Sequence, residues 1–355
     1  MLHPGRLRPA MNSKASSVDP VRLPLLTVSH GPHIHHATGY STASLMWMVN
    51  LSLMPALAWG ILIFGWRALA LTLSSVLGAL VGEHLMCRLT KHATTIKDGS
   101  AVCSGILLAF VIAPGMPLYA PFVGSLLGIA LAKGVFGGLG YNIFNVALIS
   151  RAILMATFPV DMTTKWLVPR FGHMMPDGKT MATPLAVLKE RGLNDALALL
   201  ENIPHTVFGT LRPTEKLILG LRPGCIGEVS VLFILVGAVF LLGKRVIKLY
   251  IPLSVLAGAV LMGLFGQSPL LHSLAGGLWL GAFFMATDYV TSPITPRGQI
   301  VFGLGVGVLT GVIRIWGGYP EGVCYAILLM NILVPALNGW FPPRRFASRA
   351  EGVSA

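Results

Sequence analysis

The sequence ASLMWMVNLSLMPALAWGILIFG occupies residues 43–65, and ALALTLSSVLGALVGEHLMC follows it at residues 68–87. The first run contains no Asp, Glu, Lys or Arg, and the second contains only Glu83. An α-helix rises about 1.5 Å per residue, so it needs about 20 mostly apolar residues to cross the hydrocarbon core of a bilayer. Both runs reach that length, and together they predict a pair of membrane-spanning helices.

Runs of the same kind continue along the chain. Only 11% of the residues are charged, while 54% are hydrophobic, whereas an ordinary soluble domain has about 25% charged residues. This balance excludes a water-soluble enzyme, and the net charge of +13 is typical of Lys- and Arg-rich cytoplasmic loops rather than of a nucleic-acid binder. The sequence therefore predicts an all-α integral membrane protein with about ten transmembrane helices. We expect the spans at residues 43–65, 68–87, 100–114, 119–136, 142–159, 228–243, 249–266, 271–287, 299–316 and 321–338.

One long segment interrupts this pattern. It is mixed in polarity and carries eight basic and six acidic residues, which predicts a water-exposed insert between the fifth and the sixth span. The predicted organisation is a cytoplasmic tail, a first five-helix membrane repeat, an extracytoplasmic insert, a second five-helix membrane repeat and a second cytoplasmic tail. Their expected boundaries are 1–42, 43–159, 160–226, 227–338 and 339–355.

The orientation follows from the positive-inside rule, which places Lys- and Arg-rich short loops in the cytoplasm. Ten spans put both termini on one side, and the short loops of the opposite side hold only Arg67, since the long insert is exempt from this count. The side of the termini receives Arg6, Arg8, Lys14, Arg22, Arg88, Lys91, Lys97, Lys244, Arg245, Lys248, Arg297, Arg344, Arg345 and Arg349. Both termini are therefore expected in the cytoplasm. Because each half has five spans, an internal repeat must be inverted in the membrane, an architecture of many transport proteins.

Charges inside apolar runs are costly, so they are candidates for function. They are Glu83, Lys133, Arg151, Asp288, Arg314 and Glu321. Asp288 ends a short span rich in hydroxyl groups and could face a cation or a flavin, or could cap a helix. The three cationic side chains could instead extend toward the lipid headgroups. The four cysteines lie far apart and form no CxxC pair, so we expect no metal site built by this chain alone.

The insert contains the sequence Asp177-Gly-Lys-Thr180-Met-Ala-Thr183-Pro184-Leu. A threonine directly before a proline is a natural N-cap and first helical residue, so a helix is expected to begin at Pro184. The N-terminus of a helix attracts anions, and a phosphate held at Thr183 would be stabilised there.

Several motifs resemble one family of membrane subunits. They are Asp98-Gly-Ser-Ala, Gly137-Gly-Leu-Gly-Tyr-Asn142-Ile-Phe-Asn145, Gly224-Cys-Ile-Gly-Glu228-Val-Ser230, Met285-Ala-Thr-Asp288 with Thr291-Ser-Pro293, and Gly317-Gly-Tyr-Pro-Glu321-Gly. Over residues 29–338 the chain resembles the family that holds RnfD of the Rnf electron-transport complex and the related NqrB of the sodium-pumping NADH–quinone oxidoreductase.

The resemblance implies FMN joined through its phosphate to a threonine. The attachment pattern corresponds here to Asp177, Thr180, Ala182 and Thr183, with Thr183 as the linked residue and Met181 in place of the usual glycine. Asn142, Asn145 and Asp288 are further candidates for contact with a flavin or an ion path. Whether a second, non-covalent flavin such as riboflavin is present stays open.

The implied function is that of a membrane subunit of an ion-translocating ferredoxin–NAD oxidoreductase (translocase) complex in the bacterial cytoplasmic (inner) membrane. The subunit would relay electrons and couple their flow to Na⁺ or H⁺ transport, and it is not expected to be active alone. Expected partners are the other Rnf subunits, membrane lipid and a periplasmic flavin transferase. An NqrB-like quinone-reducing subunit and a flavin-free transporter are the alternatives.

Overall fold

The computed structural model describes residues 40–91, 95–169, 180–203, 211–228, 230–266 and 268–343. The regular secondary structure of these residues is helical, and one isolated antiparallel bridge joins Leu167 to Thr180. The helices before the insert are α1 (Thr42–Phe64), α2 (Trp66–Leu89), η2 (Ile96–Asp98), α3 (Ser100–Phe110), α4 (Tyr119–Gly128), the π-helical η3 (Ile129–Gly134), α5 (Val146–Thr157) and α6 (Pro159–Thr164).

The later helices fall into two groups. The insert contributes α7 (Pro184–Arg191), α8 (Leu193–Glu201) and α9 (Pro213–Leu219). The C-terminal group consists of α10 (Val231–Gly243), α11 (Tyr250–Gly263), α12 (Pro269–Leu274), α13 (Leu278–Leu280), the π-helical η4 (Gly281–Met285), α14 (Pro296–Ile315) and α15 (Val323–Trp340).

Among the described residues, four helices are long and apolar enough to cross a membrane, namely α1, α2, α14 and α15. Shorter apolar helices accompany them. Large apolar side chains cover the outer faces of the long helices, for example Leu51, Leu62 and Leu73, each more than half exposed. Such a surface is costly in water and suits a lipid environment. The prediction of an all-α chain with several membrane-length helices is confirmed.

The expected spans are not all continuous helices. The third ends at Phe110, where the Phe110 carbonyl accepts a hydrogen bond from the Gly227 N–H at 3.1 Å. The fifth begins at Val146, because the Asn145 side chain accepts from the Ala147 and Leu148 N–H groups and caps α5. The eighth is divided into α12, α13 and η4, and Gly276 in the break has a φ of +73°, which favours glycine.

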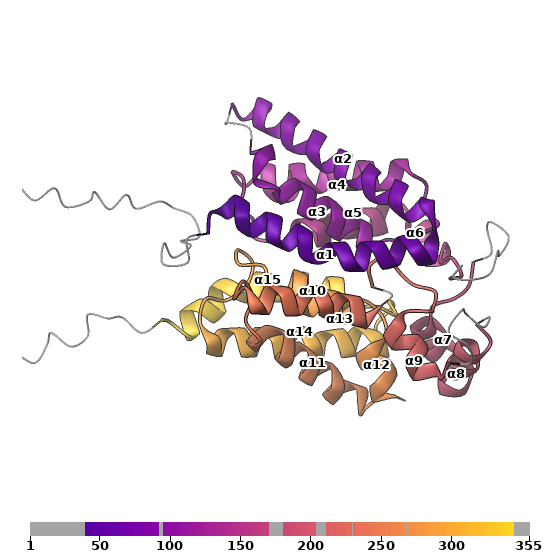
Figure 1. Cartoon of the computed structure of the whole chain (residues 1–355). Helices are drawn as coiled ribbons and strands as arrows, with labels where there is room; N and C mark the ends of the chain where they lie inside the picture. The colour runs from indigo at the N-terminus through magenta and orange to yellow at the C-terminus, as the bar shows by residue number, and fades with distance from the viewer. Residues whose placement is uncertain are drawn as a thin grey trace, which may run out of the picture.

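Figure 1 shows the helices before the insert packed as one group against the helices after it. Two pairs join the groups, since α1 packs on α10 and α5 packs on α15. The first turn of α1 and the last turn of α15 lie at the same end of the molecule, and α7, α8 and α9 lie at the other end (Figure 1). The described helices of the insert thus lie together at one end of the helical body.

The insert helices have a small apolar core of their own. The expected amphipathic stretch 184–200 forms two helices, because Gly192 has a φ of +98° and turns the chain between α7 and α8. Lys216 ties the insert together, since its Nζ donates to the carbonyl groups of Leu200, Glu201 and Ile203. The core joins the three helices to α12 through Leu185, Val187, Leu188, Ala196, Leu200, Ile203, Leu217, Leu271 and Ala275.

Candidate functional site: a charged cleft at the insert

Thr183 stands at the start of α7, as the Thr-Pro dipeptide predicts. Its Oγ1 accepts a hydrogen bond from the Ala186 N–H at 3.3 Å, and the residue is 5% exposed. Thr180 and Ala182 are exposed, whereas the backbone N–H of Met181 donates to the Trp166 carbonyl at 3.0 Å. Asp177 lies outside the described residues. Among the described residues of the motif, the Met181 backbone is thus held by Trp166, and Thr183 is the buried residue.

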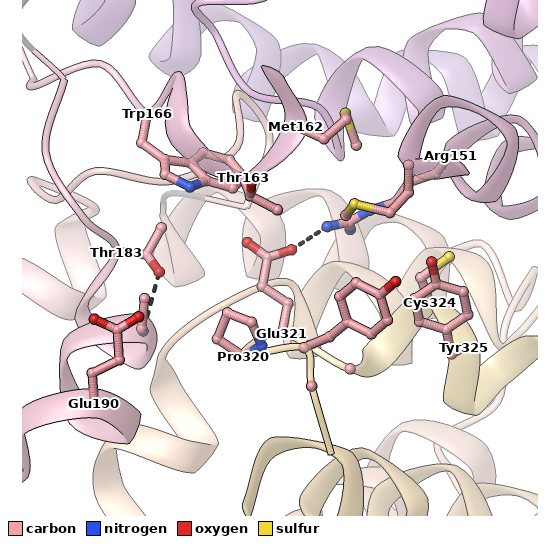
Figure 2. Close-up of a pocket in the computed structure, with 15 residues that line it drawn as sticks. Arg151, Met162, Thr163, Trp166, Thr183, Glu190, Pro320, Glu321, Cys324 and Tyr325 are labelled. Carbon is pink, nitrogen blue, oxygen red and sulfur yellow. Dashed lines mark hydrogen bonds and ion pairs between the residues drawn. The ribbon is translucent and has the colours of Figure 1, made fainter. Parts of the chain in front are cut away.

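A cleft of about 240 Å³ opens beside Thr183. We call it the Thr183 cleft. Figure 2 shows Trp166 and Thr183 on one side of it, and Arg151, Tyr325 and Glu321 on the other. Its remaining lining residues are Met155, Met162, Thr163, Ala186, Glu190, Gly318, Tyr319, Pro320, Gly322 and Cys324. The cleft combines aromatic rings with buried charge, which is the surface that a planar aromatic ligand with a polar edge requires.

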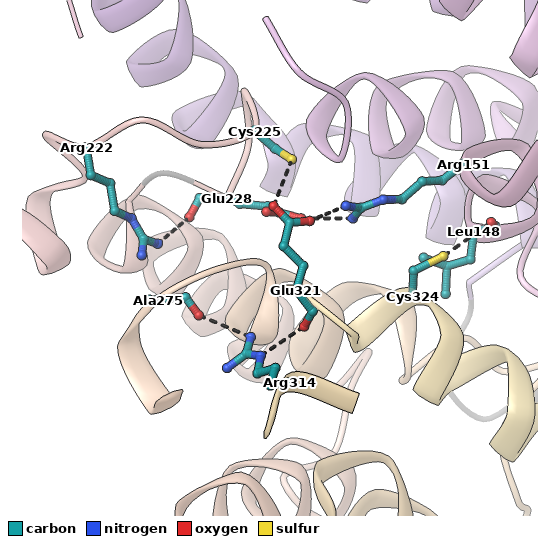
Figure 3. Close-up of polar contacts among 9 residues, drawn as sticks. All are labelled: Leu148, Arg151, Arg222, Cys225, Glu228, Ala275, Arg314, Glu321 and Cys324. Carbon is teal, nitrogen blue, oxygen red and sulfur yellow. Dashed lines mark hydrogen bonds and ion pairs between the residues drawn. The ribbon is translucent and has the colours of Figure 1, made fainter. Parts of the chain in front are cut away.

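Arg151 is the centre of the charge in the cleft. Its guanidinium forms an ion pair with the carboxylate of Glu321 and a second one with Glu228 Oε1 at 3.3 Å. The three side chains come from α5, from the loop before α10 and from the loop before α15 (Figure 3). They join both helical groups, and no more than 9% of any of these residues is exposed.

Two further buried arginines lie close by and make a different kind of contact. Arg222 Nη2 donates to the carbonyl of Glu228 at 3.0 Å. Arg314 donates to the carbonyl groups of Glu321, His272 and Ala275. Neither forms an ion pair within the described part of the chain. These five side chains, Arg151, Arg222, Glu228, Arg314 and Glu321, are called the outer cluster below (Figure 3).

Two thiols border the outer cluster. Cys225 Sγ lies 4.0 Å from Glu321 Oε1, and Cys324 Sγ contacts the Leu148 carbonyl at 3.5 Å. Ligand atoms of Cys225, Glu228 and Glu321 lie within 4.8 Å of one another, the kind of arrangement that can hold a metal ion. The Arg151 guanidinium already pairs with both carboxylates, so a cation would have to displace it. The absence of a metal stays a prediction.

A second buried ion pair joins α2 to η3. Lys133 Nζ lies 2.7 Å from Glu83 Oε1 and 2.7 Å from Ser100 Oγ, and Thr95 also donates to Glu83. Lys133, Arg151 and Arg314 are each at least 94% buried. The alternative in which these three side chains extend toward lipid headgroups is therefore wrong. Sequence position alone does not suggest the two ion pairs Glu83–Lys133 and Arg151–Glu321.

Asn142, Asn145 and Asp288 lie away from the Thr183 cleft. Asn145 Nδ2 donates to the Met285 carbonyl at 3.3 Å, three residues before Asp288. The Asp288 carboxylate accepts from the Val290 N–H at 3.4 Å and from Thr291 Oγ1 at 3.2 Å. Asn142 donates to the Phe144 carbonyl, and its Oδ1 is buried with no hydrogen-bond partner among the described residues. Of the three, Asn145 therefore links the start of α5 to the last residue of η4.

Sequence reasoning missed Arg222, Trp166 and Tyr325 as site residues. Arg222 looked like one of several cations of a water-exposed insert, yet only 2% of it is exposed. The signal available was the Gly224-Cys-Ile-Gly-Glu228 motif directly after it, since closely spaced glycines mark a backbone that passes close to another element. A Cβ at Gly227 would lie 2.1 Å from the Phe110 ring, which explains the second glycine of the motif.

Comparison with the sequences of known proteins identifies the family of this chain. A sequence profile described as the NQR2, RnfD, RnfE family matches residues 27–347. The D-type subunit of the Na⁺-translocating ferredoxin:NAD⁺ oxidoreductase complex of Acetobacterium woodii is 42% identical over 88% of this chain and 92% of its own length. The corresponding D-type subunit of the proton-translocating complex of Clostridium ljungdahlii is 40% identical over 92% of this chain and 97% of its own length. The D-type subunit of the ion-translocating oxidoreductase complex of Stutzerimonas stutzeri is 37% identical over 88% of this chain. The chain belongs to the NQR2, RnfD, RnfE family.

Proposed function

We propose that this chain is the RnfD membrane subunit of an ion-translocating ferredoxin:NAD⁺ oxidoreductase (Rnf) complex. Membership of the family over residues 27–347 and identities of about 40% to two such subunits support this assignment. The subunit contributes to the translocase as part of the complex and has no activity alone. Its electrons arrive from partner subunits, because it contains no motif typical of a soluble nucleotide-binding domain.

FMN joined to Thr183 is the cofactor of this proposal. The observation that carries it is the position of Thr183, whose side chain caps α7 at the wall of a cleft that also contains Trp166, Tyr325 and the Arg151 guanidinium. These residues fit a flavin, since Trp166 and Tyr325 would hold its aromatic ring and Arg151 would offer a guanidinium to its polar edge. Asp177, Thr180 and Ala182 complete the attachment motif that a flavin transferase reads. FMN supplies one-electron transfer when it is bound.

The proposed membrane arrangement consists of ten spans in two inverted five-helix repeats, 43–159 and 227–338. The packing supports it: α2 packs on α4 and α4 on α5, and in the second group α11 packs on α14 and α14 on α15. The first helices of the two groups contact each other, as do the last helices. The insert, 160–226, then faces away from the cytoplasm, and the tails 1–42 and 339–355 face it, in the bacterial inner membrane.

Asn142, Asn145 and Asp288 are proposed to serve a second flavin, such as riboflavin, or the ion path. The buried Asn142 Oδ1, which has no partner among the described atoms, and the contact of Asn145 with the η4 segment support this role. The name of one relative specifies protons and that of another Na⁺, so the proposal covers either ion.

Two alternatives differ in what they require. An NqrB-like subunit would contain the same flavin but reduce quinone, so quinone-dependent activity of the purified complex separates it from the proposal. A flavin-free transporter needs no attached flavin and gives no reason for the motif that ends at Thr183.

The decisive experiment is a denaturing gel of the chain under ultraviolet light, followed by peptide mass analysis. The wild type should fluoresce, and Thr183→Ala should not. Thr183→Asn is the matched control for folding, because asparagine also caps helices but has no hydroxyl to esterify. Thr180→Ala should only lower the yield. Fluorescence in the Thr183→Ala chain would disprove the site, and a dark wild type would disprove covalent FMN.

A further inference from the structure

A narrow niche adjoins the Thr183 cleft. It holds about 10 Å³ and is lined by Thr183, Arg222, Gly224, Glu228, Gly276 and Glu321 among others. A volume of that size admits about one water-sized group, and therefore one oxygen atom of a larger ligand. A Cβ built on Gly224 would meet no atom within 4 Å, so the space beside this backbone is open. Thr183 lines both the niche and the cleft.

Arg222 is a cation in the lining of the niche, and one of its N–H groups has no hydrogen-bond acceptor among the described atoms. One of its nitrogens donates to the Glu228 carbonyl, while Nε is buried and has no hydrogen-bond partner among the described atoms. An unpaired buried N–H of a charged group is costly, which points to a ligand acceptor. Burial lowers the pKa of Arg222 to about 10, so the side chain is still a cation at neutral pH.

The charge of the outer cluster is unbalanced. Three guanidinium groups, of Arg151, Arg222 and Arg314, face the two carboxylates of Glu228 and Glu321. Burial raises the pKa of the neighbouring Cys225 thiol, so it adds no negative charge. With Glu228 and Glu321 both ionised, one positive charge is left over in a region where every one of these residues is at least 91% buried. A single bound negative charge would neutralise it.

We propose that Arg222 binds the phosphate that joins FMN to Thr183. One phosphate oxygen enters the niche and accepts the hydrogen bond from Arg222 Nε, and the single negative charge of the phosphodiester neutralises the outer cluster. The inference rests on the proposed attachment of FMN at Thr183. The first turn of α7 adds free N–H groups and the positive end of its dipole.

The proposal predicts that the site distinguishes flavins by their phosphate. FMN and riboflavin share the ring system and differ only in the phosphate group, so they form a matched pair of probes. The complex that carries Thr183→Ala cannot form the ester and offers the empty site to both. In equilibrium dialysis FMN should bind at least about tenfold more tightly than riboflavin, the effect of one charge-assisted hydrogen bond. Inorganic phosphate should compete with FMN and not with riboflavin.

Variants of Arg222 in the Thr183→Ala complex then test whether Arg222 causes the preference for FMN over riboflavin. Arg222→Met should reduce the preference for FMN to less than about twofold. Arg222→Lys retains the charge but lacks Nε, so it should retain part of the preference. Lys189→Met is the control for loss of a nearby charge, because Lys189 is an exposed cation on α7 outside the niche, and it should leave the preference unchanged. If Arg222→Met does not assemble, the Arg222→Lys preference alone is decisive.

Equal affinities for FMN and riboflavin in the Thr183→Ala complex would overturn the inference, as would a preference that Arg222 variants do not change. The gel experiment on the wild type is independent of this result. A fluorescent wild type combined with an unchanged preference would disprove only the role of Arg222. A dark wild type would disprove the covalent attachment and with it the linking phosphate, and the dialysis would then report only whether Arg222 recognises the phosphate of free FMN.

Discussion

The two buried ion-pair sites of this protein differ in how their charges are balanced and in how far apart their residues lie in the chain. At the Glu83–Lys133 site one carboxylate faces one ammonium, and both residues belong to the N-terminal helical group. The outer cluster joins both groups, adds a residue of the insert, and contains one more cation than anion. A balanced local pair needs no further component to be stable. The unbalanced cluster beside a cleft is, in contrast, the arrangement of a site that receives an anion.

The largest effect is expected from Arg151→Met, which breaks the outer cluster at its centre. It leaves the buried carboxylates of Glu228 and Glu321 without their ion-pair partner, and removal of one partner from a buried pair costs about 3–5 kcal/mol. Thermal unfolding of the purified complex should show this loss, with Arg151→Lys intermediate. The exposed α7 residue Arg191 provides the control Arg191→Met. A loss as small as that of the control would mean that Arg151 does not hold the two groups together.

A double-mutant cycle sharpens the comparison with the Glu83–Lys133 site. Lys133→Met or Glu83→Gln alone should destabilise the complex, whereas the double variant should recover about 1–3 kcal/mol, because the pair balances itself. The corresponding double variant Arg151→Met with Glu321→Gln should recover much less, since Glu228 still lacks its partner. Equal recovery at both sites, measured by thermal unfolding, would contradict the distinction between them.

Asp288→Asn should affect function rather than stability. Asparagine retains an oxygen that accepts from the Val290 N–H, so the unfolding free energy should change by less than about 1 kcal/mol. Ion transport coupled to electron transfer should fall, because the proposed role of Asp288 requires its charge. Transport in vesicles containing the variant complex tests this. If the variant complex transports ions as the wild type does, the role of Asp288 is only to accept hydrogen bonds within its own loop.

The smallest effect is expected from Met181→Gly, which restores the glycine of the attachment pattern. The backbone N–H of Met181, which glycine also has, makes the contact with Trp166. The half-buried side chain should therefore matter little, and flavin occupancy on a denaturing gel should change by less than about twofold, as for a surface substitution. A large rise in occupancy would show that the methionine side chain hinders the flavin transferase.

The features that the sequence predicts correctly are those that depend on residues close together in the chain. The all-helical class, the apolar surface and the cap at Thr183 depend on residues within a few positions, so periodicity and capping preferences were sufficient for them. The outer cluster depends on contacts between residues far apart in the chain: Arg151 meets Glu228 across 77 positions and Glu321 across 170. The end of α3 was misplaced for the same reason, because the N–H that holds it comes from Gly227. The burial of Arg222 could not be predicted from its polar neighbours.

The position of the insert has a consequence for the route of electrons. The 23 residues of α1 make it about 35 Å long, and α7, which begins beside the Thr183 cleft, lies at the end opposite to the first turn of α1 (Figure 1). Electron tunnelling slows exponentially with distance, so a flavin on Thr183 cannot exchange electrons in one step with a carrier docked at that far end. If the proposed flavin exchanges electrons with such a carrier, intermediate carriers in this subunit or in its partners must divide the path. The spacing between them would then limit how fast the whole complex turns over.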